Sequence, residues 1–254
     1  MNASWRIPEV GAALRGPGVE LVAEQPEPYG TAGTLKALEP RLGPRVLVHN
    51  CDLVTDLRPE ALLATHERSG ASGTVAVVEV EARADLLHEG SRARRFVDRR
   101  REDLPGASYI GMAVLERAAI ARLSETRPLG LGETLLRELA AAGDLSVHVH
   151  AGYRADVGTP AAYLQASLDV LEGRAPAPQD EVPGRIADVE GGRAYLGPGA
   201  SAAPGTLGPG AIVLGGATVD EGARVERAIV WRDVTVSTGR RVIGSIALQG
   251  RDLV

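Results

Sequence analysis

The stretch Val46-Leu47-Val48-His49-Asn50-Cys51-Asp52 decides how the rest of the chain is interpreted. Its aliphatic run predicts a buried parallel strand, and Asp52 follows where the polar residues begin. In open α/β sheets, ligands bind at the carboxyl ends of such strands, where a carboxylate can hold a divalent cation against phosphate groups. An aspartate after a strand also commonly caps the next turn, so this position alone leaves both interpretations open.

Strands and helices alternate on both sides of this stretch. Helical and β-branched segments follow one another at a spacing that predicts a parallel sheet with right-handed crossovers. The predicted helices include 8–14, 57–69, 118–123, 132–142 and 161–173, and the predicted strands include 74–80 and 109–115. The first part of the chain is therefore expected to be an α/β domain.

Two further segments carry candidate site residues. Gly30-Thr31-Ala32-Gly33 follows two prolines and directly precedes a predicted helix. Bare backbone amides at a helix start can receive a phosphate, ribose or base, although glycine-rich turns before helices are common. Asp156, a second isolated carboxylate, lies before Thr159-Pro160, a pair typical of a capped helix start.

Composition limits the classes of function. The chain has 254 residues, enough for two domains, and a net charge of −5, which argues against a nucleic-acid partner. No apolar stretch is long enough to cross a bilayer and the first residues do not form a secretory signal, so we expect a cytoplasmic protein without a membrane partner. A single cysteine excludes an internal disulfide and a cysteine-based zinc site.

The last part of the chain has a different period. Aliphatic residues recur every six residues, with a slip of one residue in the middle, and glycines lie between them. Such a pattern predicts a parallel β-helix in which three six-residue units make one triangular coil. The predicted inward residues are Leu207, Val213, Val219, Val225, Val230, Val236, Val242 and Leu248. The open end of such a stack exposes strand edges, so we expect a homo-oligomer formed through it.

Together these segments resemble the sugar-1-phosphate nucleotidyltransferases, most closely the mannose-1-phosphate guanylyltransferase-like branch with a C-terminal left-handed β-helix. The matching segments occur in family order over nearly the whole chain: 30–36, 47–52, 96–99, 110–112, 152–160 and the six-residue repeats. The resemblance implies three parts. They are a Rossmann-like nucleotidyltransferase core, incomplete at its N-terminus (1–173), a Pro/Ala-rich linker (174–192) and a left-handed β-helix (193–254).

The resemblance also implies roles for individual residues. Carried over position by position, these are Asp52 and Asp156 for the catalytic Mg²⁺, Gly30, Thr31 and Gly33 for the nucleotide, Gly111 for the sugar, and Arg99 for the sugar phosphate. Glu133 lies near a sugar-binding glutamate of the family, but the register there is ambiguous. The family usually has lysine at the position of Arg99 and glycine at that of Cys51, and arginine differs from lysine in the geometry with which it binds phosphate.

The implied reaction joins a nucleoside triphosphate to a sugar 1-phosphate, giving a nucleotide-sugar and pyrophosphate. The product is expected to be of the GDP-mannose type, with dTDP- or UDP-glucose types as the other possibilities. The family's opening strand and Gly-rich loop are not found before Pro8, so we expect a misplaced start codon or a truncated relative. The alternative is an impaired relative acting as a nucleotide-sugar-binding or regulatory subunit. An acyltransferase is disfavoured because no histidine lies beyond His150.

Overall fold

Residues 1–14, 18–98, 100–176 and 183–254 are described in a computed structural model of the chain. They divide into two units. Unit 1 consists of Met1–Asn50 and Arg58–Ala151, and unit 2 consists of Cys51–Leu57 and Gly152–Val254. The short segment around Asp52 therefore leaves unit 1 and joins unit 2 before the chain returns.

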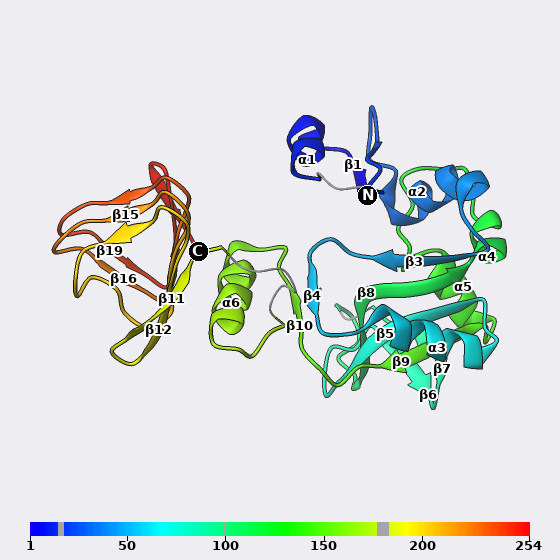
Figure 1. Cartoon of the computed structure of the whole chain (residues 1–254). Helices are drawn as coiled ribbons and strands as arrows, with labels where there is room; N and C mark the ends of the chain where they lie inside the picture. Colours follow the sequence, from blue (N-terminus) through cyan, green and yellow to red (C-terminus); the bar gives the residue numbers. More distant parts are fainter. Residues whose placement is uncertain (15–17, 99, 177–182) are drawn as a thin grey trace. The chain divides into compact units, whose positions relative to one another are not determined.

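Unit 1 is built on a six-stranded mixed sheet with the order β3-β8-β5-β9-β7-β6 (Figure 1). Among the described strands of this sheet, β5 and β9 are parallel and the other pairs are antiparallel. The predicted parallel sheet is therefore wrong except for one pair, because β8 lies between β3 and β5 and runs against both. The bounds are β3 (Arg45–His49), β5 (Gly73–Val80), β6 (Leu86–Glu89), β7 (Arg92–Phe96), β8 (Gly106–Glu116) and β9 (Leu145–Val149).

The strand before Asp52 also differs from its prediction. β3 is an edge strand that pairs antiparallel with β8, not a buried parallel strand. Val48 is buried in the core, whereas the side chain of Leu47 is 45% exposed. An edge strand buries one of its faces, and a short aliphatic run does not distinguish this from burial on both faces.

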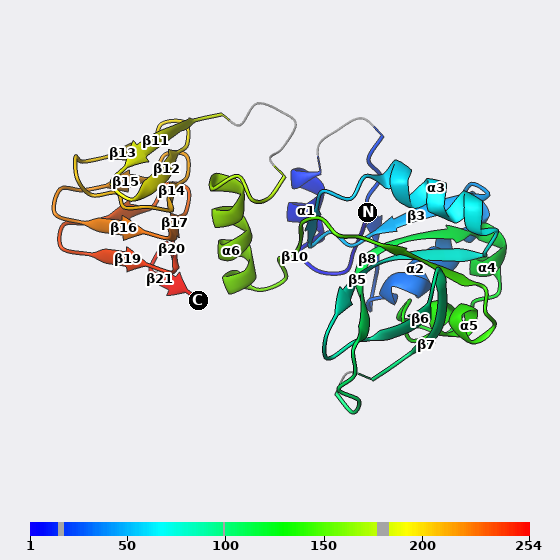
Figure 2. The same ribbon diagram turned by 90° about the horizontal axis from the view of Figure 1, so that it is seen from below.

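Helices cover both faces of the sheet (Figure 2). α3 (Pro59–Ser69) lies on one face and ends at Gly70, whose φ of 62° is typical of a helix C-terminus. On the other face, α2 (Gly30–Leu38), α4 (Arg117–Ala121) and α5 (Leu135–Ala141) contribute to the main hydrophobic core. Before α2, the chain forms β1 (Asn2–Ala3), α1 (Ile7–Ala13) and β2 (Val22–Ala23), with β1 parallel to β2; a short 3₁₀ helix, η1 (Glu39–Arg41), follows α2.

Unit 2 begins with two short strands and a helix. β4 (Leu53–Thr55) pairs antiparallel with β10 (Arg154–Asp156), although about a hundred residues separate them in the sequence. α6 (Pro160–Leu171) then begins as predicted: Pro160 is its first residue, and the Thr159 hydroxyl accepts a hydrogen bond of 3.2 Å from the Ala162 amide.

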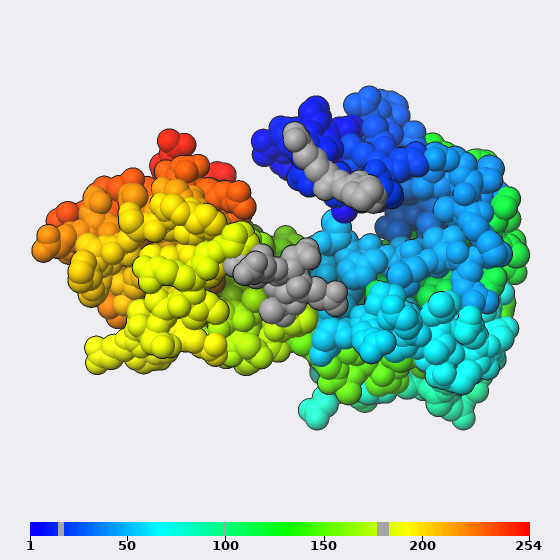
Figure 3. All heavy atoms as spheres, viewed as in Figure 1, coloured from blue at the N-terminus to red at the C-terminus, as the bar shows by residue number. Residues whose placement is uncertain are grey.

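The remainder of unit 2 consists of short strands in three stacks (Figure 2), in which all pairs are parallel except the first and last pairs of the largest stack, β11 with β12 and β20 with β21. Residue n pairs with residue n + 17, as in Ala211 with Ala228, Thr218 with Thr235 and Arg224 with Arg241. Figure 3 shows the successive circuits as adjoining bands from yellow to red. The strands are β11 (Arg185–Val189), β12 (Gly192–Leu196), β13 (Ser201–Ala202), β14 (Ala211–Val213), β15 (Thr218–Val219), β16 (Arg224–Glu226), β17 (Ala228–Val230), β18 (Thr235–Val236), β19 (Arg241–Ile243), β20 (Ile246–Leu248) and β21 (Arg251–Leu253). We call 185–253 the coil stack.

Most of the predicted inward residues of the coil stack are buried. The six predicted valines all lie in its core: Val213, Val219, Val225, Val230, Val236 and Val242. Leu207 is partly buried against them. The prediction for Leu248 is wrong, because Ala247 pairs with Val230 and takes the inward position. The circuit has 17 residues, so the register moves by one residue there, and Leu248 instead packs in the cluster that includes α6.

The units also divide the chain differently from the expected boundaries at 173 and 193. Leu164, Leu168 and Leu171 on α6 pack against Ile212, Ile229 and Ile246 of the coil stack, which groups this helix with the stack. The predicted linker contains β11, and its residues 177–182 lie outside the described part. No helix among the described residues is both long and apolar enough to cross a membrane.

Candidate functional site

Asp52 and Asp156 lie together in unit 2. Asp156 is the residue of β10 that pairs with Leu53, directly after Asp52, and the Val157 amide donates to the Asp52 carbonyl over 2.8 Å. A Cβ built on Gly158 would lie 3.0 Å from Asp156 Oδ1 and 3.3 Å from Asp52 Oδ2. The two carboxylates therefore face the same small space, which pairing of β4 with β10 creates.

These carboxylates are available to a cation. Among the described residues neither forms an ion pair, and Asp156 Oδ1 accepts one hydrogen bond, of 2.9 Å, from the Gly158 amide. Hard divalent cations bind carboxylate oxygens, and Mg²⁺ commonly takes one or two of them together with water and phosphate oxygens. The described residues include no group of three or more histidine, cysteine and acidic side chains that could hold a metal. The pair thus suits an ion shared with a phosphate ligand.

In unit 1, the start of α2 packs closely on another segment. Gly30 has a φ of 74°, and a Cβ there would lie 2.8 Å from the Leu129 carbonyl carbon. The Tyr29 carbonyl accepts from the Leu129 amide at 2.8 Å, and the Arg127 guanidinium lies 3.9 Å from the centre of the Tyr29 ring. Glycine at position 30 is therefore required by both backbone conformation and space.

Not all amides at this helix start are bare, as the glycines had suggested. The amides of Ala32 and Gly33 donate to the Leu129 carbonyl at 3.0 Å and 3.4 Å. Gly33 is buried, while Thr31 is exposed and lines a cavity. Of this segment, Thr31 is therefore the residue that faces the cavity, and Gly33 packs against the segment of Leu129.

A buried carboxylate, that of Glu24, accepts hydrogen bonds from residues at the start of α2. Glu24 is 2% exposed and accepts hydrogen bonds of 2.8 Å from the Tyr29 amide and the Asn2 side chain, as well as one from the Thr34 hydroxyl. Sequence reasoning missed this residue because its partners come from three separate segments. A lone glutamate before two prolines carries no local signal of burial.

Gly111 lies beside the end of β3. Its φ is 91°, and a Cβ there would lie 2.7 Å from Asn50 Nδ2. The Asn50 amide donates to the Gly111 carbonyl at 2.8 Å, and β8 has an irregularity here, since Val75 pairs with Ala113 and Val77 with Tyr109. Gly111 is itself buried, and the side chain that it accommodates, Asn50, lines the cavity. Asn50 was part of the decisive stretch but was not singled out.

This cavity of about 670 Å³ lies within unit 1. Its wall combines acidic, basic, aromatic and glycine residues from α2, β7, β8, α5, the residue after β3 and the segments around 85, 98 and 131. They are Thr31, Asn50, Asp85, Phe96, Val97, Asp98, Arg100, Tyr109, Gly130, Leu131, Gly132, Glu133 and Arg137. Glu133, whose alignment with the sugar-binding glutamate of the family was ambiguous, lines this cavity. Arg99, predicted to hold the sugar phosphate, lies outside the described residues.

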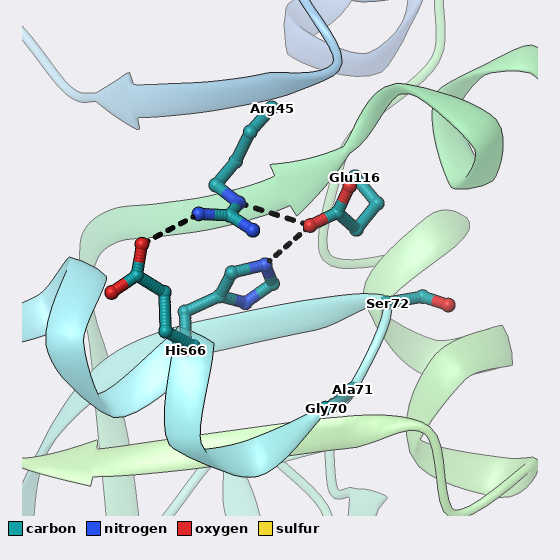
Figure 4. A pocket seen from close by; sticks show the side chains of 7 residues that line it. Arg45, His66, Gly70, Ala71, Ser72 and Glu116 are labelled. Carbon is teal, nitrogen blue, oxygen red and sulfur yellow. Dashed lines mark hydrogen bonds and ion pairs between the residues drawn. The ribbon is translucent and has the colours of Figure 1, made fainter.

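A smaller cavity, of about 180 Å³, has a different character (Figure 4). His66, 2% exposed, makes hydrogen bonds with Glu116 (3.0 Å) and Thr74 (2.9 Å). Arg45 donates to Glu116 and Glu67, each at 3.0 Å. The polar groups pair with one another and join α3 to β3, β5 and β8, so this network is structural.

The network predicts a pH dependence of stability. The hydrogen bond from His66, assisted by Arg45, holds the pKa of Glu116 below its ordinary 4.5. The charged form therefore stabilises the folded state above pH 4.5, and this contribution is lost as the pH falls through the lower folded-state pKa. We expect the free energy of unfolding to fall between pH 5.5 and pH 3 by up to about 1 kcal/mol more in the wild type than in Glu116→Gln. Urea unfolding at both pH values measures this difference; equal losses in the two proteins would contradict it.

Comparison with known proteins identifies relatives of the chain. Mannose-1-phosphate guanylyltransferase of Mycobacterium tuberculosis is 29% identical over 239 residues, which cover 90% of this chain and 64% of that protein. Mannose-1-phosphate guanylyltransferase 1 of Arabidopsis thaliana is 26% identical over 237 residues, covering 88% and 64%. The chain thus spans less than two thirds of the length of these relatives. No family model matches it.

Solved structures share the fold. HddC from Yersinia pseudotuberculosis superimposes with a TM-score of 0.54 at 19% identity, over 65% of this chain and 75% of that one. A structure of HddC complexed with GMP-PN gives a TM-score of 0.52. The chain is thus similar in sequence to mannose-1-phosphate guanylyltransferases and shares the mixed α/β fold of HddC. The resemblance to the sugar-1-phosphate nucleotidyltransferases that the sequence predicted is therefore confirmed.

Proposed function

We propose that this chain transfers a guanylyl group from GTP to mannose 1-phosphate, giving GDP-mannose and pyrophosphate. The observation that carries the proposal is the convergence of Asp52 and Asp156 on one point beside Gly158. The names of the relatives support guanylyl transfer to mannose 1-phosphate. The stacks of parallel strands support our further proposal that 193–254 is a left-handed β-helix, through which the chain self-associates.

Asp52 and Asp156 would hold the divalent cation, which we propose is Mg²⁺. Their fit rests on two hard oxygen donors that face one space and, among the described residues, have no cationic partner. When bound, the cation neutralises negative charge on the phosphates of the substrates. The roles of the other residues are those of binding and orientation.

The proposed reaction is an in-line displacement. An oxygen of the sugar phosphate forms a bond to the α-phosphorus of GTP, the bond from that phosphorus to the bridging oxygen breaks, and pyrophosphate leaves with the electron pair. No covalent intermediate with the protein is needed, so the protein contributes positioning and charge. We propose that Gly30 and Thr31 meet the nucleotide, that Gly33 holds their backbone in place, and that Gly111 admits Asn50 to the sugar. Arg99 remains our proposal for the sugar phosphate.

An assay of pyrophosphate release tests the proposal. The purified chain is incubated with Mg²⁺ and each pair of GTP, dTTP or UTP with mannose or glucose 1-phosphate. We expect GTP with mannose 1-phosphate to give the highest kcat/KM and GDP-mannose as product, and omission of Mg²⁺ to stop turnover. Preference for another pair would change the assigned base or sugar. No nucleotide-sugar from any pair, together with no binding of GDP-mannose by calorimetry, would contradict the proposal.

A further inference from the structure

The two strands that bring Asp52 and Asp156 together form a small sheet of their own. β4 and β10 have three residues each and make up a two-stranded sheet. A ribbon of two strands is marginally stable at best in water, because it buries little apolar surface. Asp156 is exposed, so packing does not fix its side chain. Contacts from outside the ribbon are therefore needed to hold the two carboxylates at one point.

Tyr153, the residue before β10, makes such contacts through its backbone and its side chain. Its carbonyl accepts hydrogen bonds from the Thr55 hydroxyl over 2.9 Å and from the Asp56 amide over 3.3 Å, where β4 ends. Its hydroxyl donates to Asp169 Oδ2 over 2.9 Å. Asp169 lies on α6, which follows β10 after the turn 157–159 (Figure 1). One residue thus ties both strands of the ribbon to the helix.

Asp169 is a firmly held acceptor for this hydroxyl. Its side chain is 15% exposed, and its other oxygen accepts from Gln165 Nε2 over 2.8 Å and from Arg174 Nη2 over 2.6 Å. Burial would raise the pKa of Asp169, but the hydrogen bonds that its carboxylate accepts, first of all from Arg174, hold that pKa below its ordinary 3.8. The carboxylate is therefore charged at neutral pH, and a hydrogen bond to a charged acceptor is about twice as strong as one between neutral groups.

We infer that Tyr153 is a positioning residue of the cation site: its hydrogen bond to Asp169 fixes β10 so that Asp156 faces the same point as Asp52. The inference rests on the proposed function, in which these two carboxylates share a divalent cation. In this role Tyr153 contacts neither the cation nor a substrate, and it acts through the backbone of β10. A purely structural role would change the stability of unit 2 and leave the affinity of the carboxylates for a cation unchanged.

Tyr153→Phe tests the inference because it keeps the ring and removes the bond to Asp169. The probe is Mn²⁺ added to the purified chain, with free Mn²⁺ measured by electron paramagnetic resonance. We expect the Kd for Mn²⁺ to rise about 10-fold, the loss that corresponds to one hydrogen bond. Asp52→Asn, measured in parallel, should remove the binding, which assigns the bound ion to the carboxylate pair.

Two control variants separate this effect from a general loss of stability. Tyr195→Phe removes a comparable bond, the one that the Tyr195 hydroxyl donates to the Pro183 carbonyl over 2.5 Å. Gln165→Ala removes another donor to Asp169 but leaves the bond from Tyr153 in place. We expect Tyr195→Phe to lower the melting temperature, and both controls to bind Mn²⁺ with the Kd of the wild type.

The outcomes separate the inference from the proposed function. With GDP-mannose formed by the wild type, an equal Kd for Mn²⁺ in the wild type and in Tyr153→Phe would overturn the inference alone. An equal rise in Kd in the Tyr195→Phe control, or no Mn²⁺ binding by the wild type, would do the same. Mn²⁺ binding that Tyr153→Phe weakens, without nucleotide-sugar formation by the wild type, would overturn the proposed function alone. Neither Mn²⁺ binding nor turnover would overturn both.

Discussion

Asp52→Asn and Asp156→Asn are each expected to lower kcat for GDP-mannose formation by about 10³-fold or more. The two carboxylates face one point. Replacing either aspartate with asparagine therefore halves the negative charge offered to a cation there. A bound cation contributes several kcal/mol to stabilising charge in phosphoryl transfer, and about 4 kcal/mol corresponds to 10³-fold. Pyrophosphate release at saturating Mg²⁺ and substrates measures the loss.

Folding should be unaffected by these substitutions. Neither carboxylate has a cationic partner among the described residues, and an amide oxygen at position 156 can still accept from the Gly158 amide. We therefore expect free energies of unfolding, measured in urea, within about 0.5 kcal/mol of the wild type. Asp220→Asn, at an exposed aspartate of the coil stack, is the matched control and should retain full activity. Near-normal turnover in both variants would remove the aspartates from the proposed site.

Gly30→Ala is expected to destabilise the protein by about 3 kcal/mol. Its φ of 74° is unfavourable for alanine, and the new Cβ would meet the Leu129 backbone, with the carbonyl carbon at 2.8 Å. Relief of this contact would move α2 away from Leu129, whose carbonyl accepts hydrogen bonds from the Ala32 and Gly33 amides. Urea unfolding followed by circular dichroism measures the change.

Gly70→Ala separates backbone strain from the contact with Leu129. Gly70 has a similar φ of 62°, yet a Cβ there would meet nothing within 4 Å. We expect it to cost about 1 kcal/mol, from backbone conformation alone. If both glycines cost the same, close packing on Leu129 is not what requires Gly30. Gly30→Ala should in addition raise the KM for GTP, which Gly70→Ala should leave unchanged.

Local chemistry made several features predictable. Thr159 and Pro160 begin α6 as expected because a capping hydroxyl and a proline act within one helical turn. Gly70 ends α3 for an equally local reason. The aliphatic period of the coil stack identified the buried valines, since an inward residue recurs in every circuit. The slip of one residue in that period arises because each circuit has 17 residues and not 18. The same slip recurs one circuit later, so the inward residue is Ala247 and not the predicted Leu248.

The candidate site could be found only in part. Asp52, Asp156, Gly30 and Gly111 were selected through a family resemblance carried by short motifs, and their roles remain proposals. Asn50 and Glu24 were not selected, because what distinguishes each is its surroundings. Burial of Glu24 depends on donors from Asn2, Tyr29 and Thr34, and the place of the Asn50 side chain depends on the space that Gly111 leaves for it.

By itself, the sequence determined the order of strands and helices, the aliphatic repeat and the places where aspartates follow strands, because these depend on neighbours along the chain. Tertiary structure alone decided that β8 would run antiparallel between β3 and β5, and that α6 would pack on the coil stack. It also decided that β4 would pair with β10 and so bring Asp52 to Asp156. The physical reason is that strand pairing and helix packing join surfaces far apart in sequence. An apolar face specifies that it will be buried, but not which partner covers it.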